Sequence, residues 1–231
     1  MQRAVLIAAV VCLVVGCGSS KQKAATTTAA LLPPTGAVLF QDDFSSHRTG
    51  WHVGHDRSGS DFYVHGRYRV TVRETDYLVH DSNGIDRASD AVSINATVRQ
   101  VEGGGGDDFG VVCLKTGLPI QGYAFGIGSA DGYVSVFRVV RAAVRKTYRE
   151  HDRDDAVEGR GVVNRLRADC FGARAAEPAH LRFYVNSRLV AAANVPSGDK
   201  RFDGVGLYVY SDHGHTVVLF DDLVVRDLKR G

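Results

Sequence analysis

An excess of charge of either sign is missing from this sequence. Its 231 residues carry 28 Lys and Arg against 26 Asp and Glu, a formal net charge of +2, and the two signs are interspersed, as in KTYREHDRDD. Binding to nucleic acid or to an anionic lipid surface usually shows as a clear positive excess. The composition therefore predicts no nucleic-acid partner.

Long hydrophobic runs are missing as well. The apolar run near the N-terminus covers residues 4–15. At about 1.5 Å per residue it makes a helix of only ~18 Å, whereas the hydrocarbon core of a bilayer measures ~30 Å. The run is too short for a transmembrane helix and has the length of the apolar region of a signal peptide, preceded here by the positive charge of Arg3.

The run ends at Val14-Val15-Gly16-Cys17, which resembles the lipobox of bacterial lipoproteins. The resemblance implies a signal peptide over residues 1–16 and a lipid on the thiol of Cys17. The protein would then be held by this lipid anchor at the extracytoplasmic face of a bacterial membrane. An ordinary secretory signal, cleaved elsewhere, is the alternative.

Behind the signal peptide the chain divides into a short tether and a long folded part. Residues 17–36 are small and mostly polar, with a pair of prolines, and cannot bury enough apolar surface to fold alone. We expect them to form a flexible tether. The folded domain is expected to cover residues 37–231.

In this domain helical spacing is missing, and apolar residues recur with a period of two. The predicted inward-facing residues of four stretches are Tyr68, Val70 and Val72; Val92, Ile94, Ala96 and Val98; Leu166, Ala168 and Cys170; and Leu181, Phe183 and Val185. About a dozen short strands without crossover helices predict an all-β fold, an antiparallel β-sandwich of two sheets. The similar groupings VLFQDDFS and LFDDLVV suggest that the first and last strands are neighbours at one edge.

The stretches LFQDDFSSHRTGW, YVHGRYRVTVR, NRLRADCFG and FDDLVV resemble the bacterial laminin-G-like or concanavalin A-like jelly-roll module. The resemblance covers residues 39–225 and implies a β-sandwich of the lectin and glucanase superfamily, which contains binding modules, lectins and hydrolases. The sequence departs from the usual pattern at Asn186-Ser187, where Asn-Gly is expected in a tight turn. A loop of another build is therefore expected there.

Cysteine is scarce, with four residues in the whole chain. If Cys17 carries a lipid, Cys113 and Cys170 remain in the mature domain, and both stand at inward-facing positions of separate strands. In an oxidising compartment such a pair predicts a disulfide. Two buried free thiols are the alternative.

Catalytic carboxylates of the glucanase kind are missing. The resemblance implies the pattern E-x-D-x-x-E on one strand, which brings an acid and an ionised carboxylate to the same sugar bond. None of the five glutamates has this spacing, and each lies in or beside an expected turn: Glu74, Glu102, Glu150, Glu158 and Glu177. We therefore name no catalytic residue.

Two loops carry groups that can bind a metal ion. HDRDDAVEG and SDHGHT supply the candidate ligands Asp152, Asp154, Asp155, Asp212, His213 and His215. Calcium is the candidate ion for the carboxylates of HDRDDAVEG, which include Glu158, although the glycine of an EF-hand loop is absent. The two histidines of SDHGHT would share one face of a strand and so approach one ion. Solvated polar loops are the alternative, and no cofactor is expected to be required.

The candidate ligand-binding residues surround the single tryptophan. Trp51 with His52 and His55 can stack on a sugar ring and bond its hydroxyls, or Trp51 can close one end of the core. Four tyrosines either line a concave sheet face or pack as ordinary cross-strand neighbours: Tyr123, Tyr133, Tyr208 and Tyr210.

The leading hypothesis is a membrane-anchored lipoprotein whose non-catalytic β-sandwich binds a carbohydrate or another cell-envelope glycan. A glycan-processing hydrolase of the concanavalin A-like superfamily is the first alternative. The second is a lipoprotein that binds an envelope protein, because laminin-G-like modules also bind proteins.

Overall fold

The computed structural model describes residues 35–75, 77–117, 119–141, 143–196 and 198–229, all within the compact unit Pro33–Gly231. Cys17, the expected signal peptide and most of the expected tether lie outside the described residues. Within the described ranges, no helix is long and apolar enough to cross a membrane.

The described residues form fifteen strands and one 3-10 turn, η1 (His47–Thr49). One sheet has nine strands in the order β13 (Arg188–Val195), β12 (Ala179–Val185), β11 (Asn164–Phe171), β6 (Ala91–Glu102), β15 (Thr216–Leu228), β4 (Tyr68–Val72), β3 (Gly59–Tyr63) and β2 (Gly54–His55), and β1 (Thr35–Asp42) also pairs with β15. The other has six in the order β10 (Ala143–His151), β9 (Tyr133–Val140), β8 (Gln121–Gly128), β7 (Asp108–Lys115), β14 (Phe202–Ser211) and β5 (Tyr77–Ser89).

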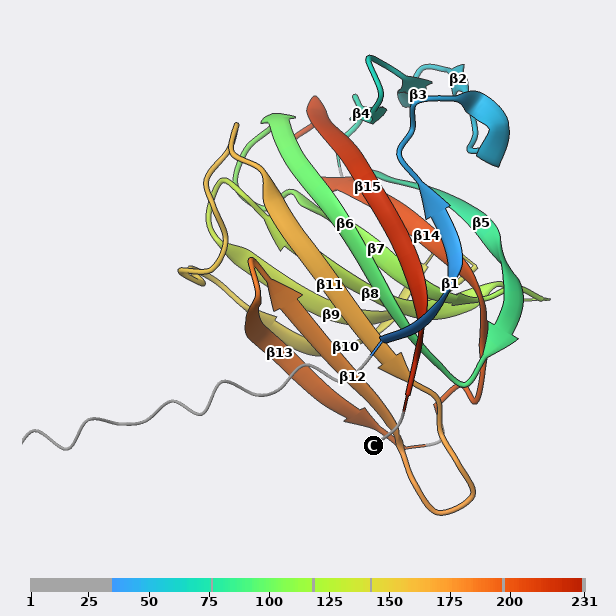
Figure 1. Ribbon diagram of the computed structural model, residues 1–231. Coiled ribbons are helices and arrows are strands. Elements are labelled where there is room, and N and C mark those ends of the chain that lie inside the picture. The colour runs from blue at the N-terminus through green and yellow to red at the C-terminus, as the bar shows by residue number, and fades with distance from the viewer. Residues whose placement is uncertain (1–34, 76, 118, 142, 197, 230–231) are drawn as a thin grey trace, which may run out of the picture. The chain divides into compact units, whose positions relative to one another are not determined.

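Each of these strand pairs is antiparallel. Figure 1 shows β6, β11 and β15 in the front layer and β7, β8 and β14 in the layer behind. The inward-facing residues predicted for β4, β6, β11 and β12 are all buried in the core between the sheets. The predicted antiparallel β-sandwich is confirmed.

The first and last strands are neighbours, as the sequence predicts. Phe40 of β1 lies opposite Val225 of β15. Their expected position at a sheet edge is correct for β1, which among the described strands pairs only with β15. It is wrong for β15, because its other side pairs with β6. A register shift after Asp221 and a left-handed Asp222, with φ of 49°, separate the part of β15 that pairs with β4 from the part that pairs with β1. The side of β15 that faces away from β6 is therefore shared by β4 and β1.

The turn between β12 and β13 corrects another expectation. Asn186 and Ser187 connect the strands in two residues, with φ of 49° and 70°, which is the type I′ arrangement that the sequence argued against. The Asn186 side chain explains why: its Oδ1 accepts a 2.8 Å hydrogen bond from the backbone N–H of Arg165, and its Nδ2 donates one of 2.8 Å to the carbonyl of Ala156. These contacts hold the turn without a glycine.

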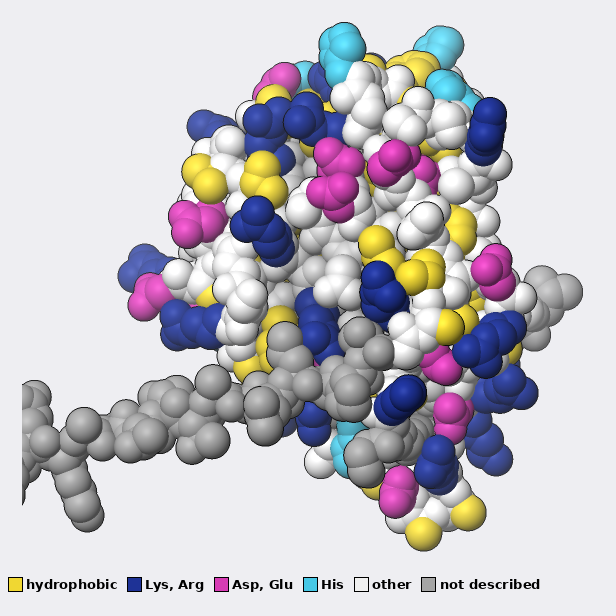
Figure 2. Space-filling model, viewed as in Figure 1, with side chains coloured by type: hydrophobic (Ala, Val, Ile, Leu, Met, Phe, Trp, Pro, Cys, Tyr) yellow, Lys and Arg dark blue, Asp and Glu magenta, His cyan; other side chains and the backbone are white. Residues whose placement is uncertain are grey.

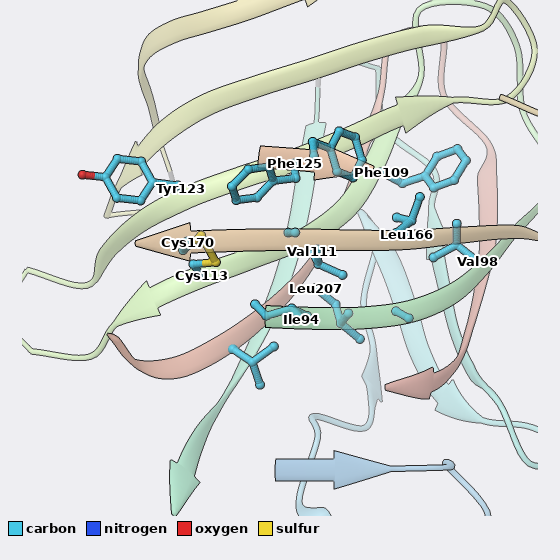
Figure 3. Close-up of a cluster of buried hydrophobic side chains, with 14 of the residues drawn as sticks. Ile94, Val98, Phe109, Val111, Cys113, Tyr123, Phe125, Leu166, Cys170 and Leu207 are labelled. Carbon is cyan, nitrogen blue, oxygen red and sulfur yellow. A yellow bond between two sulfur atoms is a disulfide. The ribbon is translucent and has the colours of Figure 1, made fainter. Parts of the chain in front are cut away.

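Cys113 of β7 and Cys170 of β11 form the predicted disulfide, with Cα atoms 6.6 Å apart. The bond joins the two sheets inside the core, where neither cysteine is exposed. Figure 3 shows it among the inward-facing side chains, near Val111 and Ile94. The two layers are thus held together covalently as well as by apolar packing.

The two sheets differ in their outer faces. Strand β6 alternates between buried and half-buried residues over most of its length, as expected for a sheet with one wet face, whereas β7 and β8 are almost continuously buried. The outer face of the six-stranded sheet carries a second apolar cluster of Val112, Leu114, Ala124, Phe137 and Tyr208. This face holds the candidate site.

Candidate functional site

Two hollows that share Leu78 lie on the outer face of the six-stranded sheet. The first, here called the polar hollow, measures about 370 Å³ and is lined by the rings of Tyr133, Phe137 and Tyr210 and by the carboxylates of Asp108, Asp131, Glu150, Asp152 and Asp212. The second, here called the apolar hollow, measures about 280 Å³. Val112, Leu114, Ile120, Val139 and Tyr208 supply its apolar lining, and Asp81, Ser82 and Arg141 line it as well.

Asp108 is the buried carboxylate of the polar hollow. Its Oδ2 accepts a 2.7 Å hydrogen bond from the hydroxyl of Ser135, and its Oδ1 accepts one of 3.1 Å from the hydroxyl of Tyr208. Burial raises the pKa of Asp108 to about 6, although both hydrogen bonds act in the opposite direction. Near pH 6 this group therefore exists as a mixture of acid and carboxylate.

Gly126 makes this arrangement possible. A Cβ atom at this position would overlap the hydroxyl of Tyr208 and the carboxylate of Asp108. Because β8 has no side chain there, the three groups Asp108, Ser135 and Tyr208 meet over its backbone. The glycine thus has a steric role in the floor of the hollow.

Glu150 and Tyr133 form one wall of the hollow. Glu150 lies opposite Ser135 in the pairing of β10 with β9 and hydrogen-bonds to the Tyr133 side chain. Burial, followed by the charges of Asp108 and Glu150, raises the pKa of the Tyr133 phenol, which stays protonated at physiological pH. The wall therefore presents a phenol beside a carboxylate. Spacing along the sequence does not predict that these two residues meet.

Loops far apart in the sequence meet at the rim. The Oδ2 of Asp131 accepts a 2.8 Å hydrogen bond from the backbone N–H of Gly106, and the N–H of Asp212 donates one of 3.1 Å to Asp107. The N–H of Asp154 bonds at 2.9 Å to the carbonyl of Gly132. These bonds gather the segments EGGGGDD, SADG, HDRDD and SDHGHT around one hollow.

Of the six candidate metal ligands, two line the polar hollow: Asp152 and Asp212. The others are directed to local partners or solvent. Asp154 pairs with His151 at 3.0 Å, and His215 pairs with Glu102 at 2.6 Å. His213 pairs with Asp212 at 3.0 Å, and Asp155 is exposed. Among the described residues no three His, Cys, Asp or Glu side chains converge as a metal-binding group, so calcium binding at these positions stays a prediction.

Trp51 has a structural role, which corrects its candidacy as a sugar-stacking residue. The side chain is 3% exposed and packs against Phe40, Phe44 and Tyr68. Its ring faces are therefore covered by protein. The alternative interpretation, that Trp51 closes one end of the core, describes its place correctly.

The histidines next to Trp51 are exposed. His52 and His55 lie at the end of the sandwich where β2 to β4 pair, and Figure 2 shows histidine side chains gathered at this end. The backbone N–H of His52 bonds to Asp81, while its ring faces solvent.

Of the four candidate tyrosines, Tyr123 is buried in the core between the sheets, and the other three belong to the two hollows.

One sequence signal would have located this site. In FGVVCLK, GYAFGIG and GVGLYVYS, apolar residues and glycines occupy both the inward-facing and the outward-facing positions of the strand. Such strands are buried on both faces. The prediction from sequence considers only the inward-facing positions. It therefore does not identify Asp108, Asp131, Phe137 and Glu150 as residues that line one hollow.

Comparison with known proteins found no matching family model and no matching curated protein. Among solved structures, the carbohydrate-binding module CBM66 from Bacillus subtilis is 15% identical, with a TM-score of 0.54 over 78% of this chain and 96% of that chain. A β-glucanase from Bacillus licheniformis is 12% identical, with a TM-score of 0.57 over 85% and 100%. The catalytic domain of an endo-1,3-β-glucanase (laminarinase) from Thermotoga petrophila RKU-1 is 8% identical, with a TM-score of 0.56 over 86% and 100%. At these identities the likeness shows the fold, a concanavalin A-like jelly roll.

Proposed function

We propose that the polar hollow binds a carbohydrate, and that the sandwich is the non-catalytic binding module of a lipoprotein anchored through Cys17 at the extracytoplasmic face of a bacterial membrane. One observation carries the binding proposal: aromatic rings and carboxylates converge in a single hollow on the outer face of the six-stranded sheet. The anchor rests on the lipobox-like Val14-Val15-Gly16-Cys17.

A sugar fits the chemistry of this hollow. A pyranose has apolar C–H faces, which pack on aromatic rings, and hydroxyl groups, which donate hydrogen bonds to carboxylates. Tyr133 and Tyr210, which are half-buried, supply the rings, and Glu150 supplies an accessible carboxylate in the same space. The names of similar structures agree with this ligand class, since one is a carbohydrate-binding module and two are glucanases.

A glycan hydrolase is the second candidate, and Asp108 is the observation that favours it. Its pKa of about 6 is that of a general acid, and the ionisable Glu150 lies in the same hollow. Both oxygens of Asp108, however, are engaged by Ser135 and Tyr208, and its side chain is buried. Binding without catalysis therefore accounts better for the geometry.

The experiment is a glycan-array screen of the unit Pro33–Gly231, which contains every described strand and the core. We expect reproducible binding that Tyr210→Ala reduces at least tenfold, equivalent to ~1.4 kcal/mol. Phe62→Ala is the matched control, because Phe62 is a 37% exposed aromatic residue on β3 of the other sheet. Silence across the array would contradict carbohydrate binding and favour a protein partner.

Two further assays separate the remaining parts of the proposal. Release of reducing sugar from a bound glycan, abolished in Asp108→Asn, would establish the hydrolase instead of the binding module. Cys17→Ala in the full chain is expected to move the protein from the membrane fraction to the soluble fraction. Retention of this variant in the membrane would contradict the lipid anchor.

A further inference from the structure

Resting on the proposed function, we propose that the ligand is a sugar that bears an aliphatic chain, with the sugar ring in the polar hollow and the chain in the apolar hollow. The proposal concerns the ligand class of the site and identifies the second hollow as the subsite for the chain.

The apolar hollow has the lining that a chain requires. Val112 and Leu114 of β7 form part of its floor and are each 5% exposed, and Val139 of β9 and Ile120 add further aliphatic surface. Ile120 is 45% exposed. The residues occupy the outer face of a sheet, which in a sandwich of this kind normally carries polar side chains toward water.

The two hollows adjoin each other. Leu78 lines both. Tyr208 lines the apolar hollow, while its hydroxyl bonds to Asp108 in the polar hollow. The ring of Phe137, in the polar hollow, meets the ring of Tyr208 edge-on with centroids 5.4 Å apart. A single molecule can therefore contact both hollows across the Phe137–Tyr208 pair.

The chemistry of the pair of hollows selects an amphiphile over an unmodified oligosaccharide. Asp81, Ser82 and Arg141 also line this hollow. A second sugar unit lying on the aliphatic surface of Val112, Leu114 and Ile120 would nevertheless turn hydroxyl groups toward side chains that cannot hydrogen-bond, and desolvating them opposes binding. An aliphatic chain loses no hydrogen bonds there. Each buried methylene strengthens binding about fourfold, and the limited volume of about 280 Å³ sets a chain length beyond which the gain stops.

The test is calorimetric titration of the unit Pro33–Gly231, with cooperative thermal unfolding as the check on folding. The probes are glucose, hexyl, octyl and decyl β-D-glucosides below their micelle-forming concentrations, and the matching 1-alkanols. We expect affinity to rise about fourfold per methylene until the chain fills the hollow. Each glucoside should also bind at least tenfold more tightly than the alkanol of the same chain length.

Matched variants locate the chain. Ile120→Asn places a polar group on the apolar hollow and should weaken octyl glucoside at least tenfold. Leu189→Asn makes the same kind of change at a 43% exposed residue on β13 of the other sheet and should leave binding unchanged. Glu150→Gln should weaken the glucoside and leave the alkanol unaffected.

The outcomes are distinct for the two proposals. Affinity that is independent of chain length, in a protein that binds glycans on the array, would overturn the amphiphile and leave the carbohydrate-binding function in place. Alkanols that bind as tightly as glucosides would overturn the sugar subsite. Equal losses in Ile120→Asn and Leu189→Asn would overturn the placement of the chain.

Discussion

The hydroxyl of Tyr208 on β14 donates a 3.1 Å hydrogen bond to Oδ1 of Asp108 on β7, across 100 residues of sequence. Tyr208 lies opposite Gly110 in the pairing of these strands, and Gly110 lies opposite Gly126 on β8. The absence of a side chain at Gly126 leaves room for the phenol over the sheet, whereas a Cβ at Gly110 would meet the backbone of Phe125. The floor of the candidate site is therefore built from residues that three separate strands contribute.

Gly126→Ala is predicted to disrupt this floor. Its Cβ would overlap Tyr208 and Asp108 and force both side chains to move, so we expect a loss of 1–3 kcal/mol in the free energy of unfolding (about the cost of overpacking) together with weaker glycan binding. Gly84→Ala is the control, since Gly84 lies in β5 of the same sheet and an added Cβ would meet nothing within 4 Å. Chemical denaturation and glycan titration of both variants check this. Equal stability of the two proteins would count against the steric role.

Asp108→Asn is predicted to change how stability depends on pH. The pKa of Asp108 in the folded protein is about 6, above the ordinary carboxyl value, so the folded state holds this proton more tightly than the unfolded state. Its contribution to the free energy of unfolding is therefore fully present below about pH 4, falls as the pH rises to about 6, and stays low above that.

Asparagine removes this titration, and the variant should gain up to about 3 kcal/mol relative to the native protein between pH 4 and pH 7.5. Asp61, whose pKa burial also raises to about 6, gives both proteins a slope of the same sign. The comparison of the two proteins isolates Asp108. Denaturant titrations at the two pH values measure the difference, and parallel pH profiles would contradict the raised pKa.

The disulfide is predicted to contribute strongly to stability. It closes a loop with a sequence separation of 57 residues, for which loss of unfolded-state entropy gives about 4 kcal/mol. The double variant Cys113→Ala with Cys170→Ala should lower the free energy of unfolding by roughly this amount and retain the strand content. Urea unfolding with circular dichroism provides the measurement. A double variant as stable as the native protein would show that packing alone joins the sheets.

Trp51→Phe tests whether Trp51 is structural. The indole Nε1 is buried without a hydrogen-bond partner, so phenylalanine removes an unsatisfied donor while keeping an aromatic ring among Phe40, Phe44 and Tyr68. We expect glycan affinity within twofold of the native protein (roughly 0.4 kcal/mol). Trp51→Ala, in contrast, should lower the free energy of unfolding by about 3–5 kcal/mol. A large loss of affinity in the phenylalanine variant, with stability retained, would restore Trp51 as a ligand contact.

Much of the fold was predictable because period-2 alternation reports directly which residues face a core. Spacing alone predicts that Val92, Ile94, Leu166 and Phe183 face inward, and all four are buried. The disulfide followed from the same logic. The Asn186-Ser187 turn was not predictable, since its left-handed conformation depends on tertiary hydrogen bonds to the Asn186 side chain.

The candidate site was harder to predict because it is formed by the ends of loops and by the outward-facing residues of strands that are apolar on both faces. Asp152 and Asp212 belong to separate loops, and nothing in their local spacing indicates that both line one hollow. Trp51 was prominent because it is the only tryptophan, yet its burial depends on aromatic neighbours from β1 and β4 and from the loop after β1.

The position of a bound glycan on the sandwich distinguishes the polar hollow from the other surfaces of the described residues. A two-dimensional NMR titration of the unit Pro33–Gly231 with a glycan that binds on the array should shift the backbone amides around the polar hollow, including those of Tyr133, Ser135 and Tyr210. Shifts confined to this face are the predicted result. Shifts centred on His52 and His55, or on the outer face of the nine-stranded sheet, would contradict binding in the polar hollow.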